Sequence, residues 1–113
     1  MNIESTYSKR IYKIKDLNRL REQVNIIFRV IGKDEKQEFT SRNSNEIQHI
    51  YNYRIANKTA TMLLTLYNED IDVIEVGKSY KLSNGLISTA KNGLRLMKGK
   101  KGFFERIIAN ELN

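Results

Sequence analysis

The sequence predicts a small all-β domain, either a barrel or a sandwich. Five or six short segments carry the apolar patterns of strands, glycine and asparagine separate them, and only one short segment has helical spacing. The length of 113 residues fits one domain with one core. We therefore expect a flexible lead-in over residues 1–10 and a single domain over residues 11–113.

The segments before residue 46 predict one strand between two less regular stretches. Residues 11–21 have apolar residues at three-residue spacing, which indicates a short strand or a 3₁₀ turn. Residues 24–31 alternate apolar and polar positions, as a strand with one buried face does, and Gly32 is expected to end this strand. Residues 33–45 are polar, and we expect a loop or a hairpin tip there.

Residues 46–67 predict a β-hairpin. Two alternating segments, 46–55 and 60–67, flank the sequence Asn57-Lys58-Thr59, and asparagine tolerates the left-handed backbone of a tight turn. In the second strand the side chains divide between two faces, with Met62, Leu64 and Leu66 on one and Thr61, Leu63, Thr65 and Tyr67 on the other.

The C-terminal half predicts a short helical turn followed by two or three strands. Residues 68–76 combine acidic residues with Ile71 and Ile74 at three-residue spacing, which predicts a helical turn that Gly77 ends. The remaining segments are a strand over 79–88 with a bend at Gly85, a turn at 91–93, a strand over 94–98, and a strand or helix over 103–112.

The charge of the chain is strongly basic and unevenly distributed. There are 20 Lys and Arg against 13 Asp and Glu, a net charge of +7. Residues 9–29 hold seven basic and two acidic residues, and residues 91–106 hold six basic and one acidic residue. Such basic stretches indicate a polyanionic partner, because they can follow a phosphate backbone. Tyr51, Tyr53 and Tyr67 lie on strand faces where they fit either base stacking or core packing.

Several classes of function are excluded by residue types that the chain lacks. There is no cysteine and one histidine, His49, which excludes disulfides and thiolate zinc sites, and we expect neither a metal nor a cofactor. Gly77-Lys78-Ser79 resembles the end of a phosphate loop, but Asp72 stands where the first glycine is required. We expect no enzyme and no small-molecule substrate. A polar N-terminal stretch without a long apolar run predicts an intracellular protein that does not bind membranes.

A series of motifs resembles the single-stranded-DNA-binding OB-folds of the replication protein A type. Residues 55–69, IANKTATMLLTLYNE, are similar to that family's hairpin, V-A-D-x-T-G, an alternating strand and then W-D with an acidic residue. Residues 76–85, VGKSYKLSNG, are similar to P-G-D-x-I/V-x-L-x-x-G. Residues 14–17 and 24–31 match the opening strand, and residues 86–100 match the closing strands.

Within that type, the chain most resembles the SOSS-B proteins, the DNA-binding members of the SOSS complex, and the archaeal single-stranded-DNA-binding proteins. The resemblance implies a five-stranded Greek-key OB barrel with a helical turn between its third and fourth strands. It also implies binding of single-stranded DNA in DNA repair or genome maintenance, together with a large helical scaffold subunit. The location would be the nucleus in a eukaryote and the cytoplasm otherwise. The sequence does not distinguish RNA from DNA as the partner, because basic charge and base stacking serve to bind both nucleic acids.

The expected binding residues are one or two tyrosines and six basic side chains. Tyr67 stands at the family's tryptophan position and would stack on a base, as could Tyr53. The residues expected to contact phosphates are Lys91, Arg95, Lys98, Lys100 and Arg54, with Arg42 in a loop that closes over the strand.

The chain also departs from the family at three aromatic positions. Leu86 replaces a tyrosine, and Ala90 and Met97 stand at two later aromatic positions. Fewer stacking residues make affinity depend more on charge. The alternative is a protein-interaction OB-fold, a structural subunit with weak or no nucleic-acid binding, in which Leu86, Ala90 and Met97 form an apolar contact patch.

Overall fold

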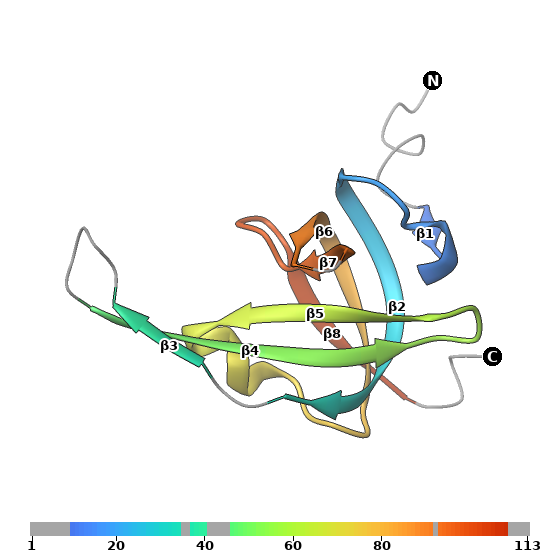
Figure 1. The fold of residues 1–113 in the computed structure, drawn as a ribbon. Coiled ribbons are helices and arrows are strands. Elements are labelled where there is room, and N and C mark those ends of the chain that lie inside the picture. Colours follow the sequence, from blue (N-terminus) through green and yellow to red (C-terminus); the bar gives the residue numbers. More distant parts are fainter. Residues whose placement is uncertain (1–9, 35–36, 41–45, 92, 109–113) are drawn as a thin grey trace.

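The computed structural model describes residues 10–34, 37–40, 46–91 and 93–108, and for residues 37–40 it describes the backbone. Within these ranges, strands dominate and two short 3₁₀ helices connect them (Figure 1). The elements in chain order are β1 Ile11–Tyr12, η2 Ile14–Asp16, β2 Arg21–Lys33, β3 Gln37–Thr40, β4 Ile47–Ala56, β5 Thr61–Tyr67, η3 Asn68–Val73, β6 Ser79–Ala90, β7 Gly93–Met97 and β8 Phe103–Ile107.

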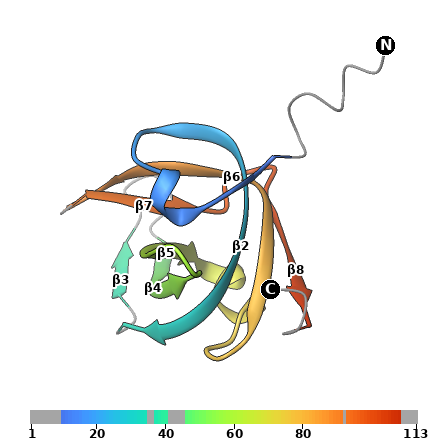
Figure 2. The same ribbon diagram turned by 90° about the vertical axis from the view of Figure 1, so that its right-hand side faces the viewer.

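Five of the strands close into a barrel. They follow the order β2, β4, β5, β7 and β6, and β6 pairs again with β2 (Figure 2). The pairing of β5 with β7 is parallel, with Leu64 opposite Leu96, whereas the other four pairings are antiparallel. Closure leaves these strands without free edges along most of their length. The prediction of an all-β, five-stranded barrel is therefore confirmed.

Short additional strands extend the barrel and shift the numbering of its parts. β1 runs parallel to β2, β3 pairs with β4, and β8 pairs with β6. The pairing of β3 carries the β4 hairpin well beyond the barrel (Figure 1). The expected helical turn is η3, which lies between β5 and β6. When β1 and β3 are left out of the count, this position is between the third and fourth strands.

Three local predictions need correction. Residues 37–40, within the segment expected to be a loop or a hairpin tip, form a strand paired with β4, because backbone pairing requires no apolar pattern. Gly32 does not end β2, which continues to Lys33 through a shift of register between Val30 and Gly32. The 3₁₀ helix ends at Val73, and Gly77, at φ +93°, forms the later turn into β6.

The bend predicted at Gly85 is present and has a steric cause. The register of β2 against β6 shifts between Val24, which faces Gly85, and Ile26, which faces Leu82. A Cβ at Gly85 would lie 2.5 Å from the Cδ2 atom of Leu82. Glycine therefore lets β6 curve across β2 without displacing a core leucine.

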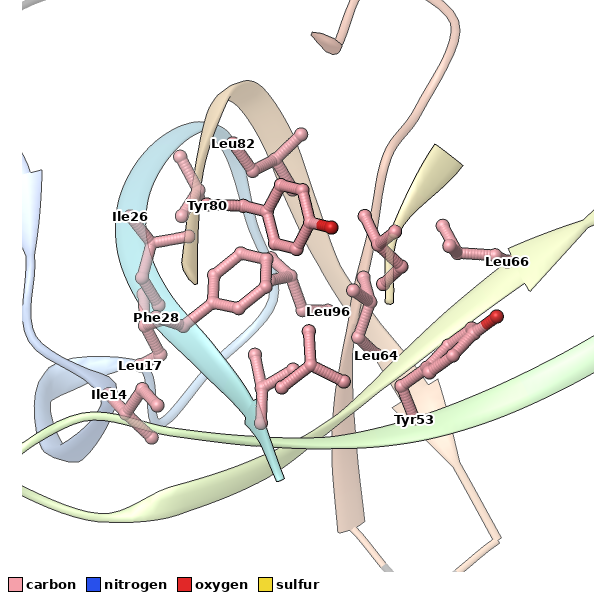
Figure 3. Packing of buried hydrophobic residues seen from close by; sticks show 14 of the residues in the cluster. Ile14, Leu17, Ile26, Phe28, Tyr53, Leu64, Leu66, Tyr80, Leu82 and Leu96 are labelled. Atoms are coloured by element: carbon pink, nitrogen blue, oxygen red, sulfur yellow. The ribbon is translucent and has the colours of Figure 1, made fainter. Parts of the chain in front are cut away.

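The core fills the barrel with side chains from every barrel strand (Figure 3). Phe28 and Tyr80 are buried, with ring centroids 6.3 Å apart, and Phe104 meets Phe28 edge to face at 6.4 Å. Ile14 and Leu17, in and after η2, are also buried, so η2 covers one end of the barrel.

Most of the predicted N-terminal lead-in is not among the described residues. The predicted lead-in over residues 1–10 falls outside them except for Arg10, whose guanidinium carbon lies 4.4 Å from the centre of the Tyr12 ring. None of the helices among these residues is long and apolar enough to cross a membrane.

Candidate nucleic-acid interface

The candidate interface is the side of β4, β5 and β7 that points away from the core. Along β5, Leu64 and Leu66 point inward, so alternation turns Leu63, Thr65 and Tyr67 outward. We call this surface the outer face, and its residues are Asn52, Arg54, Leu63, Thr65, Tyr67, Arg95 and Met97.

Strand register fixes which of these side chains are neighbours. Thr65 lies between Asn52 of β4 and Met97 of β7. Leu63 lies between Arg54 and Arg95 in the same way. Residues on three different strands, far apart in the sequence, therefore form two adjacent rows across the outer face.

Tyr67 is half-buried at one end of the outer face. It lines a hollow of about 200 Å³ together with Thr65, Met97, Lys98 and Lys100. Tyr67 therefore shares a hollow with two lysines, a combination that suits a base beside a phosphate. The structure places Tyr67 on the outer face, as its alternation with Leu64 and Leu66 predicts.

The Lys98 ammonium lies between the hollow and the 3₁₀ helix η3. Its Nζ atom is 3.6 Å from Oδ2 of Asp70, and both side chains are partly exposed. Lys100 is exposed in the loop that follows β7. These two cations therefore stand at the Tyr67 end of the outer face, with Lys98 partly neutralised by Asp70.

Arg54 and Arg95 stand at the opposite end of the outer face. Arg54 is exposed on β4, and Arg95 is half-buried on β7, with Leu63 of β5 between them. Leu63 and Tyr67 are four residues apart on one strand, so about 13 Å separates the two ends. Lys91, exposed in the turn from β6 to β7, lies beyond Arg95.

Arg95 carries a buried donor. Its Nε atom is buried, and no acceptor among the described residues receives a hydrogen bond from it. A buried N–H without an acceptor costs about 1–3 kcal/mol.

Tyr53 does not belong to the interface. Only 1% of its surface is exposed, and its side chain lies among the core residues (Figure 3). Its hydroxyl donates a 2.7 Å hydrogen bond to the carbonyl oxygen of Ile71. Burial, with smaller contributions from Tyr51 and Asp72, raises the pKa of Tyr53 to about 12. The ring packs in the core, so it offers no face to a base. Arg42, the remaining predicted residue, lies outside the described residues.

A second hollow, of about 480 Å³, opens beside Tyr51, between the first half of β4 and η3. Lys33 places its ammonium 4.0 Å from the centre of the Tyr51 ring, a cation–π contact that covers this tyrosine. Sequence reasoning missed Lys33, because only the register of β2 against β4 sets it opposite Tyr53, two residues from Tyr51. Within the described ranges, no three His, Asp or Glu side chains gather closely enough to hold a metal ion.

A closed barrel of this strand order, with its single parallel pairing and its 3₁₀ helix before β6, defines the OB fold. Residues 18–106 match the family model described as single-stranded DNA binding protein Ssb-like, OB fold. The chain therefore belongs to the Ssb-like family of OB-fold single-stranded-DNA-binding proteins. None of the curated proteins compared with it matches its sequence.

Solved structures support the fold. A replication factor A related protein from Methanobacterium thermoautotrophicum is similar with a TM-score of 0.73 at 19% identity, covering 89% of this chain and 94% of that one. The second OB-fold domain of replication protein A from Methanococcus maripaludis gives 0.66 at 21%, covering 87% and 95%. A replication protein A heterotrimer bound to single-stranded DNA gives 0.70 at 14%, covering 90% and 26%.

Proposed function

We propose that this chain binds single-stranded nucleic acid, DNA in the first place, along the outer face, and that it acts by binding and not by catalysis. The observation that carries the proposal is the row across the outer face that places Arg54 and Arg95 on either side of Leu63. A phosphate oxygen is an anionic acceptor that suits a guanidinium donor. The family membership supports the same class of ligand.

The outer face suits a strand that passes from the arginine row to the Tyr67 hollow. Arg54 and Arg95 would hold phosphates at one end, and Lys98 and Lys100 at the other, with Tyr67 beneath a base. Between them Leu63 and Met97 offer apolar contact but no aromatic ring. Affinity should therefore depend mainly on charge.

Fluorescence anisotropy with a labelled oligo-dT tests this proposal. Tyr67→Ala should weaken binding about five- to hundredfold, because one stacked base is lost, whereas Tyr67→Phe should bind like the parent. Arg95→Gln should weaken binding, and Arg106→Gln, on β8 away from the outer face, should change it far less. Equal effects of Arg95→Gln and Arg106→Gln, or an unchanged affinity of Tyr67→Ala, would refute the assignment of the outer face.

We further propose that the chain serves genome maintenance within a SOSS-like complex that has a large helical scaffold, in the nucleus of a eukaryotic source. The sequence resemblance to the SOSS-B proteins supports this role. Affinity purification from the native organism tests it. Recovery of a large helical protein together with single-stranded DNA is expected, and recovery of the chain alone would contradict it.

A protein-interaction role is the second candidate, and one observation favours it. Leu86 and Met97 face each other across β6 and β7, and both are half-buried. Ala90 lies on the same side of β6, four residues from Leu86. Such an apolar row fits a protein partner as well as a base. A stable complex with a protein, together with no binding of oligonucleotides at low salt, would favour this role over the first.

A further inference from the structure

We infer that Arg10 and Arg21, which both pack on the ring of Tyr12, form a second phosphate-binding site at the rim of the barrel, which holds a strand after it leaves the outer face. We call these three residues the rim site. The inference deepens the proposed function and rests on it, because it extends the path of the nucleic acid. It comes from two guanidinium groups that share one aromatic ring.

The backbone and one of the two arginines of the rim site are held in place by hydrogen bonds. Tyr12 belongs to β1, which runs parallel to β2, and it lies opposite Ile26. The buried side chain of Asn25 donates from Nδ2 to the carbonyl oxygen of Arg10 at 3.3 Å, which anchors the start of β1 to β2. Arg21 begins β2, and its Nη1 atom donates a 2.9 Å hydrogen bond to the Tyr12 hydroxyl. This bond holds the Arg21 guanidinium against the Tyr12 ring.

The rim site concentrates positive charge. The guanidinium carbon of Arg10 lies 4.4 Å from the centre of the Tyr12 ring, and that of Arg21 lies 4.9 Å from it. The two like charges are therefore no more than about 9 Å apart, a distance at which they repel each other. Neither forms an ion pair with a carboxylate of the described residues, although Asp16 and Glu22 are close in the sequence. A phosphate beside the two guanidinium groups would reduce this repulsion.

The rim site adjoins the arginine end of the outer face. Arg21 lies opposite Ile87 of β6, and Ile87 lies opposite Leu96 of β7, the neighbour of Arg95. Two strand spacings, about 10 Å, therefore separate the backbone of Arg21 from that of Leu96. Arg10 is exposed, so a strand that passes Arg95 can continue across β6 and reach it. This continuity with the outer face favours a nucleic-acid phosphate over an acidic peptide as the anion.

Anisotropy with labelled dT15 over a range of salt concentrations tests the rim site. Arg10→Gln should weaken binding about tenfold at low salt, the effect of one charge-assisted hydrogen bond, and should reduce the salt slope by about 0.7. Arg10→Lys keeps the charge and should retain the parental slope. Arg21→Gln should act like Arg10→Gln, and Arg10→Gln alone decides the test if Arg21→Gln fails to fold. Arg106→Gln removes the same charge from β8 and is the matched control, which should change affinity and slope far less.

The outcomes separate the rim site from the proposed function. Binding of dT15 by Arg10→Gln with the affinity and slope of the parent would overturn the rim site and leave binding on the outer face intact. An equal loss in Arg106→Gln would also overturn it, because net charge alone would then explain the effect. Absence of binding by the parent at low salt would instead overturn the proposed function. Weaker and less salt-dependent binding by Arg10→Gln, with the slope restored in Arg10→Lys, would establish the rim site.

Discussion

Replacing Tyr53 by phenylalanine should change how the stability of the barrel depends on pH. The Tyr53 hydroxyl is buried and donates a 2.7 Å hydrogen bond to the carbonyl oxygen of Ile71, which connects β4 to η3. Tyr53→Phe keeps the ring in the core and removes only this bond. Below pH 9 we therefore expect the free energy of unfolding to fall by about 0.5–1.5 kcal/mol.

At alkaline pH the difference should shrink and then reverse. The folded pKa of Tyr53, about 12, lies above the ordinary value of 10.0, so folding favours the neutral phenol. This stabilisation is complete below about pH 10 and is lost as the pH rises toward 12. At pH 11, one unit above the ordinary pKa, the parent's free energy of unfolding has fallen by about 1.4 kcal/mol, because one pKa unit corresponds to about 1.4 kcal/mol. Tyr53→Phe lacks the phenol and does not lose this stability.

Urea denaturation of both proteins at pH 8 and pH 11 measures the effect. All other titrating groups are common to the two proteins, so the difference between them isolates Tyr53. Tyr53→Phe should be the less stable protein at pH 8 and should match or exceed its parent at pH 11. A stability difference that is the same at both pH values would refute the placement of the Tyr53 hydroxyl in the core.

Three further changes follow from the packing and the charges. Gly102→Ala should destabilise the barrel by more than about 2 kcal/mol in urea denaturation, because its Cβ would collide with the carbonyl oxygen of Lys98, and equal stability would contradict that packing. Leu96→Ala should cost about 2–5 kcal/mol by the same measurement, since Leu96 is fully buried in the core. Asp70→Asn should tighten oligo-dT binding about two- to fivefold, because it releases Lys98, and weaker binding would argue against a role for Lys98.

The barrel could be predicted from the sequence because its hairpin and core follow simple periodicities. The alternation of residues 60–67 places Leu64 and Leu66 inside and Tyr67 outside, as the structure does. The turn at Asn57 has a local cause as well, since the Asn57 Oδ1 atom accepts a 2.8 Å hydrogen bond from the Thr59 N–H. Such features depend on neighbours in the sequence.

What escaped prediction depends on pairings between distant segments. Strand β3 has no apolar pattern and is defined by its pairing with β4. Tyr53 fitted either the core or a stacking role, and the decisive partner of its hydroxyl, Ile71, lies on a different element 18 residues later. The pair of Asn52 and Thr65, and the row of Arg54 and Arg95, likewise become visible only from the register of the strands.

The salt dependence of oligo-dT binding is the most direct test of the central claim, that basic side chains on the outer face and at its two ends bind a single strand. If Arg54, Lys91, Arg95, Lys98 and Lys100 all contact phosphates, the logarithm of the binding constant should fall with the logarithm of salt concentration with a slope of about −3.5. Arg95→Gln should reduce that slope by about 0.7. No binding at low salt, or an affinity that salt leaves unchanged, would contradict the account.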